Sequence, residues 1–276
     1  MKIFLTGATG FIGSYFLKEA LKKGHTIYAP SIKKRKSKKN LRWLHGSFNK
    51  NWKELKKCEV LIHLAAAGVN NKNISLKDAF DVNVTKSVSL LINAAKANCK
   101  NWLIVGSASE YGRTALKKKP LHIDSKLLPE TSYEISKYFF SKLSIKISKK
   151  LKCKCRVMRL FPVYGKGELE GRLFPSLLKA IESKNKFYLN RPNIIRDFIN
   201  VKEVAQILLE AANFKIKNKR FPQIWHVASG KPVSLKAFVR YICKKNNSKI
   251  KIIVKSDTNK NNHNYISDQK SIWKLY

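Results

Sequence analysis

The sequence predicts a doubly wound α/β protein, in which helices cover both faces of a mostly parallel sheet. Two observations support this prediction. Short apolar runs alternate with amphipathic stretches through the first 161 residues, and the first apolar run ends in a glycine-rich turn that leads into a helix. Such apolar runs are typical of parallel strands buried on both faces, and they occur at residues 1–6, 25–30, 60–66, 102–107 and 155–161.

The opening turn, G-A-T-G-F-I-G at residues 7–13, has the features of a dinucleotide-binding loop. Gly7 allows a tight turn, Gly10 lets the backbone approach a pyrophosphate, and Gly13 lets the helix pack closely on the strand. Free N–H groups and the dipole at the helix N-terminus favour phosphate. A plain strand-to-helix turn is the alternative. We therefore expect a Rossmann-like domain whose turn contacts the cofactor through Gly7, Thr9, Gly10, Phe11 and Ile12.

Beyond residue 161 the alternation of strands and helices becomes looser. Helices are predicted at 76–97, 133–149, 172–183 and 204–212, and strand-like runs at 196–201, 224–227 and 250–254. We expect a dinucleotide-binding domain over residues 1–161, with later strands from about 194–230 returning to it. Residues 162–193 and 231–276 are expected to form a smaller, interleaved C-terminal lobe that binds the substrate.

The charge of the chain is extreme, but its distribution argues against a specific nucleic-acid partner. The formal net charge is +40, from 57 Lys and Arg against 17 Asp and Glu. Most of the excess is Lys, and it is spread along the whole chain without a nucleic-acid-binding motif. The five cysteines fall mostly in apolar runs, which favours packing over a metal or redox site. Because no apolar stretch could span a bilayer, we expect a cytoplasmic protein.

The residues after the second predicted strand indicate which dinucleotide is bound. In this architecture an acidic residue about 20 residues after the glycines often holds the ribose 2′-OH. Here Ser31 stands at the strand end, and Lys33 and Arg35 follow it without an acidic residue. A hydroxyl followed by cations suits a 2′-phosphate, so we expect NADP as the cofactor, with NAD as the alternative. A solvated basic loop would explain Lys33 and Arg35 nearly as well.

Tyr133 and Lys137 are candidates for proton transfer. They are four residues apart on a predicted helix and therefore share a face. A lysine ammonium beside the phenol is expected to lower the pKa of Tyr133, which would make it a general acid or base near neutrality. Ser107 stands at the carboxyl end of a predicted strand, where it could hydrogen-bond the reacting oxygen.

Together these motifs resemble the extended short-chain dehydrogenases/reductases of the NAD-dependent epimerase/dehydratase family, whose members act on nucleotide sugars. The segments that carry the resemblance are the glycine turn, H-L-A-A at 63–66, N-V at 83–84, G-S-A-S-E-Y-G at 106–112, Y-E-I-S-K at 133–137, R-L-F-P-V-Y-G at 159–165 and R-D-F-I-N-V at 196–201. The S-E-Y-G ending and the G-E-x-x-G-R-L-x-P-S run at 167–176 resemble abequose-synthase-like 4-ketoreductases in particular.

The resemblance implies a hydride-transfer site. Its catalytic residues would be Ser107, Tyr133 and Lys137. Besides the glycine turn and the 31–35 stretch, the cofactor would contact Leu64, Ala65, Ala66, Tyr133 and Lys137. The substrate would contact Asn83, Ser109, Arg172 and Arg196. No metal is implied.

The most specific activity that the resemblance implies is reduction of the C4 ketone of an NDP-4-keto-6-deoxyhexose, with Tyr133 as general acid. A nucleotide-sugar 4-epimerase or a dehydratase is the alternative, although Ala108 and Ser109 do not supply the acidic pair typical of dehydratases. A cofactor-sensing regulator is a third reading, but such proteins usually lack the Tyr or the Lys. The resemblance also implies a homodimer formed through the helices near 76–97 and 133–149.

Overall fold

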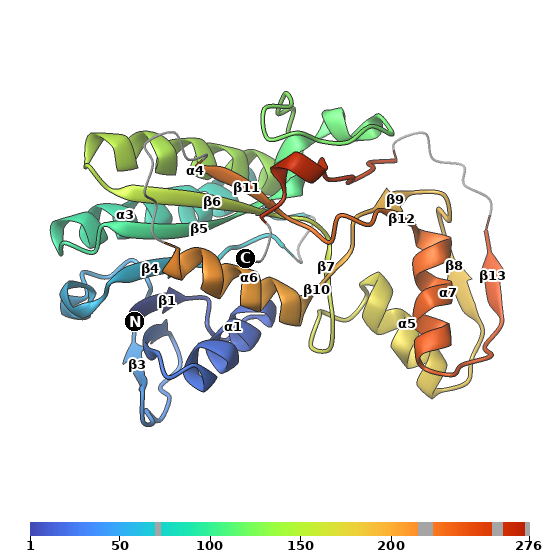
Figure 1. The fold of residues 1–276 in the computed structure, drawn as a ribbon, viewed down its shortest axis with the longest axis horizontal. Coiled ribbons are helices and arrows are strands. Elements are labelled where there is room, and N and C mark those ends of the chain that lie inside the picture. Colours follow the sequence, from blue (N-terminus) through green and yellow to red (C-terminus); the bar gives the residue numbers. More distant parts are fainter. Residues whose placement is uncertain (70–72, 215–222, 256–261, 274–276) are drawn as a thin grey trace.

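The computed structural model of the chain describes residues 1–69, 73–214, 223–255 and 262–273. A seven-stranded sheet lies at its centre, in the order β11-β6-β5-β4-β1-β2-β3 (Figure 1). All neighbouring strands of this sheet pair in parallel. The predicted doubly wound α/β fold is therefore confirmed.

The strands of the central sheet follow the apolar runs of the sequence. They are β1 (Lys2–Thr6), β2 (Thr26–Ser31), β3 (Leu41–His45), β4 (Val60–His63), β5 (Asn101–Ser107), β6 (Lys154–Leu160) and β11 (Ile224–Val227). Only β3 lacks a counterpart among the predicted strands. It lies at the edge of the sheet, where exposed Arg42 and His45 interrupt the apolar pattern.

Helices cover the two faces of the sheet (Figure 1). On one face lie α1 (Phe11–Lys22) and α6 (Val201–Asn213), and on the other α3 (Ser87–Lys96) and α4 (Ser132–Lys150). Side chains alternate along β1, so Ile3 and Leu5 join the apolar cluster under the first pair, whereas Phe4 joins the cluster under the second. The hydrophobic core is thus divided into two layers by the sheet.

The helix predicted over residues 76–97 has three parts. α2 (Leu76–Phe80) leads into a π-helical turn (Asp81–Lys86), which continues as α3. The hydroxyl of Ser87 donates to the carbonyl of Val82 at 2.8 Å. The wider π turn changes the direction of buried Asn83, and π turns occur frequently at functional sites.

A smaller apolar cluster lies beside the central sheet, on the right of Figure 1. It is built from α5 (Leu173–Glu182), α7 (Leu235–Lys245) and the parallel pair β8 (Phe187–Leu189) and β13 (Ile252–Val254). We propose that this cluster is the substrate-binding lobe expected over residues 162–193 and 231–276.

The strand-like run predicted at 196–201 is not a strand of the central sheet. It forms β9 (Ile195–Arg196), which pairs with β12 (Val233–Ser234), and β10 (Ile199–Asn200), which pairs with β7 (Val163–Tyr164). Of the later segments, α6 and β11 do pack with the first domain.

Residues 272–273 cover the outer edge of β11. Ile272 forms a parallel bridge with His226, and the N–H of Trp273 donates to the carbonyl of His226 at 2.9 Å. The 3₁₀ turns of the chain are at Lys53–Lys57, Ala108–Tyr111, Arg113–Leu116 and Gln269–Ser271. In the described ranges no helix has the length and apolarity that a membrane crossing requires.

Candidate active site

The carboxyl ends of β1, β4 and β5 form the sheet edge at which the predicted site residues meet. β1 pairs with β2 on one side and with β4 on the other. The chain order of the strands reverses between β1 and β4, and α/β proteins bind ligands beyond the strand ends at such a point. Here the glycine turn follows β1, the 64–66 loop follows β4, and Ser107 ends β5.

The glycine turn fits a dinucleotide phosphate. Gly7 has a φ of +71°, and a Cβ atom on it would lie 2.7 Å from the backbone nitrogen of Ala65. A Cβ atom on Gly13 would lie 2.0 Å from the carbonyl oxygen of Gly7, so only glycine lets α1 approach β1 this closely. α1 begins after Gly10 without a side-chain cap or an acidic residue in its first turn, which leaves its terminal N–H groups available to phosphate. The remaining predicted contacts on this turn are exposed or half-buried: Thr9, Phe11 and Ile12.

The 64–66 loop, with its predicted contacts Leu64, Ala65 and Ala66, is held against the glycine turn by a buried hydrogen-bond chain. His63 lies between two hydroxyls, with Nδ1 at 2.7 Å from Thr6 Oγ1 and Nε2 at 2.9 Å from Ser87 Oγ. Thr6 Oγ1 also accepts the N–H of Ala65 at 3.3 Å. Burial, with a smaller contribution from the charge of Lys137, lowers the pKa of His63 to about 3. His63 is therefore neutral and packs the loop, as expected for a residue without an acid–base role.

Ser107, Tyr133 and Lys137 come together at this edge. Tyr133 and Lys137 lie on successive turns of α4, whose start is fixed by a capping box between Thr131 and Glu134. The hydroxyl of Ser107 lies close enough to the phenol of Tyr133 to lower its pKa, and it is 2.7 Å from the hydroxyl of Ser109. This arrangement of a hydroxyl, a phenol and a lysine can polarise a carbonyl and exchange a proton with its oxygen.

The model of the NAD dependent epimerase/dehydratase family matches residues 3–228 of the chain. The chain belongs to this family. It is 27% identical over 262 residues to dTDP-6-deoxy-L-talose 4-dehydrogenase (NAD(+)) of Aggregatibacter actinomycetemcomitans, covering 91% of this chain and 93% of the relative. It is 23% identical over 256 residues to CDP-abequose synthase of Salmonella muenchen, covering 91% and 83%. The predicted resemblance to the family, abequose synthases included, is therefore confirmed.

The fold of the chain is also similar to that of solved structures. MoeE5 in complex with UDP-glucuronic acid and NAD superposes with a TM-score of 0.83 at 21% identity, covering 98% of this chain and 91% of MoeE5. Together with the family assignment, this likeness identifies the chain as an enzyme of the NAD-dependent epimerase/dehydratase type with a Rossmann-like fold.

The pKa of Tyr133, one of the predicted catalytic residues, differs from the expectation. Burial raises the pKa of Tyr133 to about 12, against the smaller downward effect of its hydrogen bond with Ser107. Lys137 is also buried, which lowers its pKa to about 8, and its Nζ donates to the carbonyl of Val105 at 2.6 Å. The expected lowering of the Tyr133 pKa is therefore wrong for this structure, because burial of the phenol raises the pKa and Lys137 donates to the end of β5 instead.

Lys137→Met is expected to change how stability depends on pH. In the unfolded chain Lys137 keeps its proton up to about pH 10.5, whereas in the folded chain it loses it near pH 8. Between these values the unfolded state binds more protons, so the free energy of unfolding of the wild type rises with pH, by about 3 kcal/mol at most. The variant lacks this rise. Urea unfolding of both proteins across this pH range measures the free energy of unfolding. If this free energy depends on pH in the same way in both proteins, Lys137 does not lose its proton on folding in this range.

Asn83, a predicted substrate contact, is buried and hydrogen-bonded within the protein. Its Oδ1 accepts the N–H of Ala67 at 2.8 Å, and its Nδ2 donates to the carbonyl of Ala67 and to Ser136 Oγ, both at 3.0 Å. The side chain is only 2% exposed. Asn83 therefore ties the loop after β4 to α4, and its contact with a substrate stays a prediction. The third predicted substrate residue on this side, Ser109, remains beside Ser107.

The two predicted substrate arginines reach the site region from the smaller lobe and from β9. Arg172 precedes α5 and donates to the carbonyl of Val69, and its charge acts on the phenol of Tyr133. Arg196 lies over the ring of Tyr265, with its guanidinium carbon 4.5 Å from the ring centroid, and donates to the carbonyl of His263. Burial lowers the pKa of Arg196 to about 10, at which it remains charged near neutrality.

Glu168 is the glutamate of the 167–176 run, but it is not among the predicted site residues. Its loop packs on α1, because the hydroxyl of Tyr15 donates to the carbonyl of Lys166 at 2.9 Å. Burial raises the pKa of Glu168 to about 7, while the nearby charge of Arg172 lowers it. Its Oε2 is buried without a hydrogen-bond partner among the described residues.

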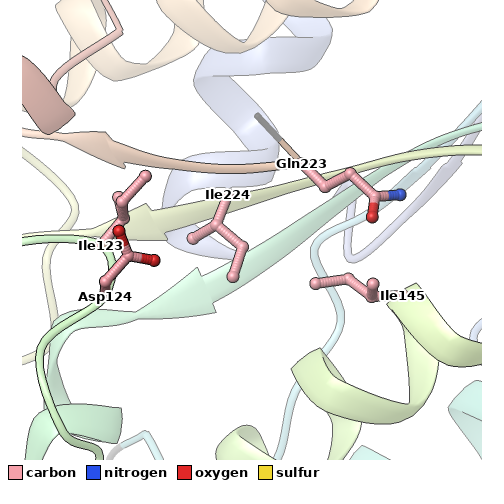
Figure 2. A pocket seen from close by; sticks show the side chains of 5 residues that line it. All are labelled: Ile123, Asp124, Ile145, Gln223 and Ile224. Carbon is pink, nitrogen blue, oxygen red and sulfur yellow. The ribbon is translucent and has the colours of Figure 1, made fainter. Parts of the chain in front are cut away.

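A cavity of about 280 Å³ lies elsewhere, beside β11 and α4 (Figure 2). It is lined by Ile123, Asp124, Ile145, Gln223 and Ile224. None of the predicted site residues lines it, so it is not part of the site at the strand ends.

Proposed function

We propose that the chain reduces the C4 ketone of an NDP-4-keto-6-deoxyhexose by hydride transfer. The observation that carries this proposal is the meeting of Ser107, Tyr133 and Lys137 beyond the end of β5, with Tyr133 as a neutral phenol. The relative that is named as a 4-dehydrogenase of a 6-deoxy sugar nucleotide supports the position of the reacting carbon.

When bound, the reduced nicotinamide supplies the hydride that a ketone needs. Tyr133 then gives its proton to the C4 oxygen, on which negative charge develops. The hydroxyl of Ser107 donates a hydrogen bond to the same oxygen. Lys137, whose pKa is about 8, is charged near neutrality, and its Nζ is bound to the carbonyl of Val105, from where it would hold the nicotinamide ribose when the cofactor is bound. Arg172 and Arg196 supply positive charge for the diphosphate of the substrate.

A nucleotide-sugar 4-epimerase is the second candidate, and the family name itself supports it. An epimerase must first oxidise C4, for which Tyr133 has to accept a proton as a phenolate. A pKa of about 12 favours the protonated phenol instead, which is the form that a reductase uses. The protonation of Tyr133 thus favours the reductase.

A panel of NDP-4-keto-6-deoxy sugars mixed with NADPH or NADH tests the proposal. Stoichiometric oxidation of the reduced cofactor is the expected result. If the protein oxidises no cofactor with any of them but interconverts two NDP-hexoses, it is an epimerase.

We propose further that NADP is preferred, bound through Ser31, Lys33 and Arg35. Arg35 Nε donates to Ser31 Oγ at 3.3 Å, and its guanidinium carbon lies 5.1 Å from the centroid of the Trp43 ring. This stacked cation beside a hydroxyl at the end of β2 suits a ribose 2′-phosphate. The NAD-dependent family and the NAD bound to MoeE5 support NAD as the alternative.

Arg35→Ala is expected to raise KM for NADPH about tenfold or more and to leave KM for NADH nearly unchanged, because only NADPH carries the 2′-phosphate. Steady-state kinetics with both cofactors measure the effect. Arg42→Ala, which removes an exposed cation from neighbouring β3, is the matched control and should change neither KM. An equal rise in KM for both cofactors would show that Arg35 does not bind the 2′-phosphate.

A homodimer is proposed from the apolar surface of the helices that flank the site. Phe139 of α4 is exposed and its ring centroid is 5.5 Å from that of Phe80, while Leu76 and Ile92 are exposed on α2 and α3. Sedimentation velocity is expected to give twice the monomer mass of 31.7 kDa, and Phe139→Glu should shift the protein toward the monomer. A wild type that sediments as a monomer at all concentrations would contradict this.

A further inference from the structure

A fully buried ion pair lies directly behind Ser107. Glu110 is 0% exposed and Arg159 is 1% exposed, and Arg159 Nε donates to Glu110 Oε2 at 3.0 Å. The other carboxylate oxygen, Oε1, accepts the backbone N–H of Ser107 at 2.8 Å and the hydroxyl of Ser141 at 2.9 Å. Every contact of this carboxylate is thus with the protein, and one of them is the main chain of a catalytic residue.

A pair of this kind contributes little to net stability, because the cost of removing both charges from water offsets their attraction. It does supply a fixed geometry and a fixed charge. Gly106 leaves room for it, since a Cβ atom there would lie 2.8 Å from Glu110 Oε1 and 3.2 Å from Arg159 Cγ. The absence of a side chain at Gly106 therefore allows the carboxylate to lie against the end of β5.

One face of α4 connects this carboxylate to the catalytic pair. Tyr133, Lys137 and Ser141 follow at intervals of four residues, which places them on successive turns about 6 Å apart. Tyr133 contacts Ser107, Lys137 binds the carbonyl of Val105, and Ser141 binds the carboxylate itself. Three turns of α4 are thereby docked on one strand end.

The charge of Glu110 acts on both members of the pair. Burial lowers the pKa of Lys137, and the negative charge of Glu110 raises it. Burial raises the pKa of Tyr133, and Glu110 raises it further. The groups that face Glu110 are Arg159 of β6, Tyr111 of its own turn and the α4 residues named above.

Behind Arg159, the network continues through Tyr111 to a neutral imidazole, that of His226. Arg159 Nη1 donates to the hydroxyl of Tyr111 at 3.0 Å, and that hydroxyl lies 2.6 Å from Nε2 of His226. Burial, with the charge of Arg159, lowers the pKa of His226 to about 3, so His226 adds no charge near neutrality.

We propose that Glu110 is a positioning residue of this site, which fixes the main chain of Ser107 and places the carboxylate of its buried ion pair beside Tyr133 and Lys137. The charge of Glu110 offsets part of the lowering of the Lys137 pKa by burial, and it adds to the raising of the Tyr133 pKa that burial causes. It thereby favours a cationic lysine and a neutral tyrosine, the two forms that the ketone reduction requires. This inference rests on the proposed function where it is tested by kinetics. Its second test, the titration of Lys137, does not depend on that function.

Glu110→Gln is the deciding variant, because it keeps the shape of the side chain and removes its charge. We expect kcat to fall about tenfold or more with KM for the sugar nearly unchanged. The loss of kcat at alkaline pH is expected to move to lower pH, because both pKa values decrease without the negative charge. A variant that loses kcat by one factor at every pH, with no movement of the profile, would overturn the electrostatic role.

Lys137 can be titrated by NMR without any substrate. The lysines are labelled at Cε and Nζ, and the signal of Lys137 is the one that is missing in Lys137→Met. The pKa of Lys137 is expected to fall below its value of about 8 in Glu110→Gln. The matched control is Asp197→Asn. It neutralises a second fully buried carboxylate, which accepts hydrogen bonds from Ser229 and Gly230. In this variant the pKa of Lys137 should equal that of the wild type. An unchanged pKa in Glu110→Gln, or an equal fall in both variants, would overturn the proposal.

The kinetic test and the titration test distinguish a failure of the proposed function from a failure of the role of Glu110. If the wild type turns over no nucleotide sugar, the proposed function fails while the titration still decides the role of Glu110. Should Glu110→Gln not fold, Glu110→Asp keeps the charge and shortens the side chain. It is then expected to lower kcat without moving the pH profile, and a profile that moves with the charge retained would contradict the inference.

Discussion

Tyr133→Phe is expected to lower kcat about a thousandfold and to leave cofactor binding intact. The substitution removes one oxygen atom, and with it the proton that Tyr133 would give to the C4 oxygen; general acid catalysis typically contributes 10²–10⁴-fold. Ser107 and Lys137 remain, so the ketone is still polarised but has no acid in contact with it. Absorbance of the reduced nicotinamide measures turnover, and its fluorescence measures binding.

Tyr138→Phe is the control for this experiment, because it makes the same change on the same helix at a half-buried residue outside the site. It is expected to have the activity of the wild type. If Tyr133→Phe kept more than a tenth of the wild-type kcat, Tyr133 would not be the acid, and the buried Glu168 would become the next candidate.

Gly13→Ala is expected to destabilise the fold, and Gly10→Ala to weaken cofactor binding without unfolding it. A Cβ atom at position 13 would meet the Gly7 carbonyl oxygen at 2.0 Å, so α1 would have to move away from β1. Overpacking of this kind costs about 1–3 kcal/mol or more. At Gly10 the nearest atom to a Cβ is the same oxygen at 3.3 Å, and φ is −76°, which alanine adopts readily.

Urea unfolding and cofactor titration of both variants separate these two effects. A Cβ atom at position 10 would stand where the backbone has to approach the pyrophosphate, so the Kd for the cofactor should rise at least tenfold while the unfolding midpoint stays near that of the wild type. If Gly10→Ala binds the cofactor normally, the phosphate does not lie against this turn.

The parts of the site that depend on local pattern could be predicted from the sequence. Ser107 ends an apolar run, and Tyr133 and Lys137 share a face of a helix; both statements require only the periodicity of strands and helices. The spacing of the glycines likewise predicted the tight contact between α1 and β1. Alternation of apolar runs and helices was sufficient for the fold class.

The partners of the polar side chains could not be predicted, because they come from distant parts of the chain. The acceptor for Lys137 is 32 residues earlier, and Asn83 binds Ser136, 53 residues later. No periodicity encodes such distances. Burial determined that the pKa of Tyr133 is raised and not lowered, and a sequence motif does not show how deeply a side chain is buried.

The unpredicted elements of the smaller lobe have a different cause. α7 buries Phe238, Val239, Ile242 and Cys243 at the spacing of an amphipathic helix. The signal was present in the sequence, but three lysines and an arginine occupy four of the other seven positions and lower the overall apolarity of the segment. β8 is only three residues long, which is too short for alternation to be recognised.

The bridge between Ile272 and His226 covers part of the sheet edge at β11, away from the helices of the proposed dimer. β11 is the last strand of the sheet, and the carbonyl of His226 points away from β6 toward the N–H of Trp273. An uncovered edge of this kind is a template on which a strand of another molecule can add. By occupying it, residues 272–273 close one end of the sheet to the growth of intermolecular β-structure.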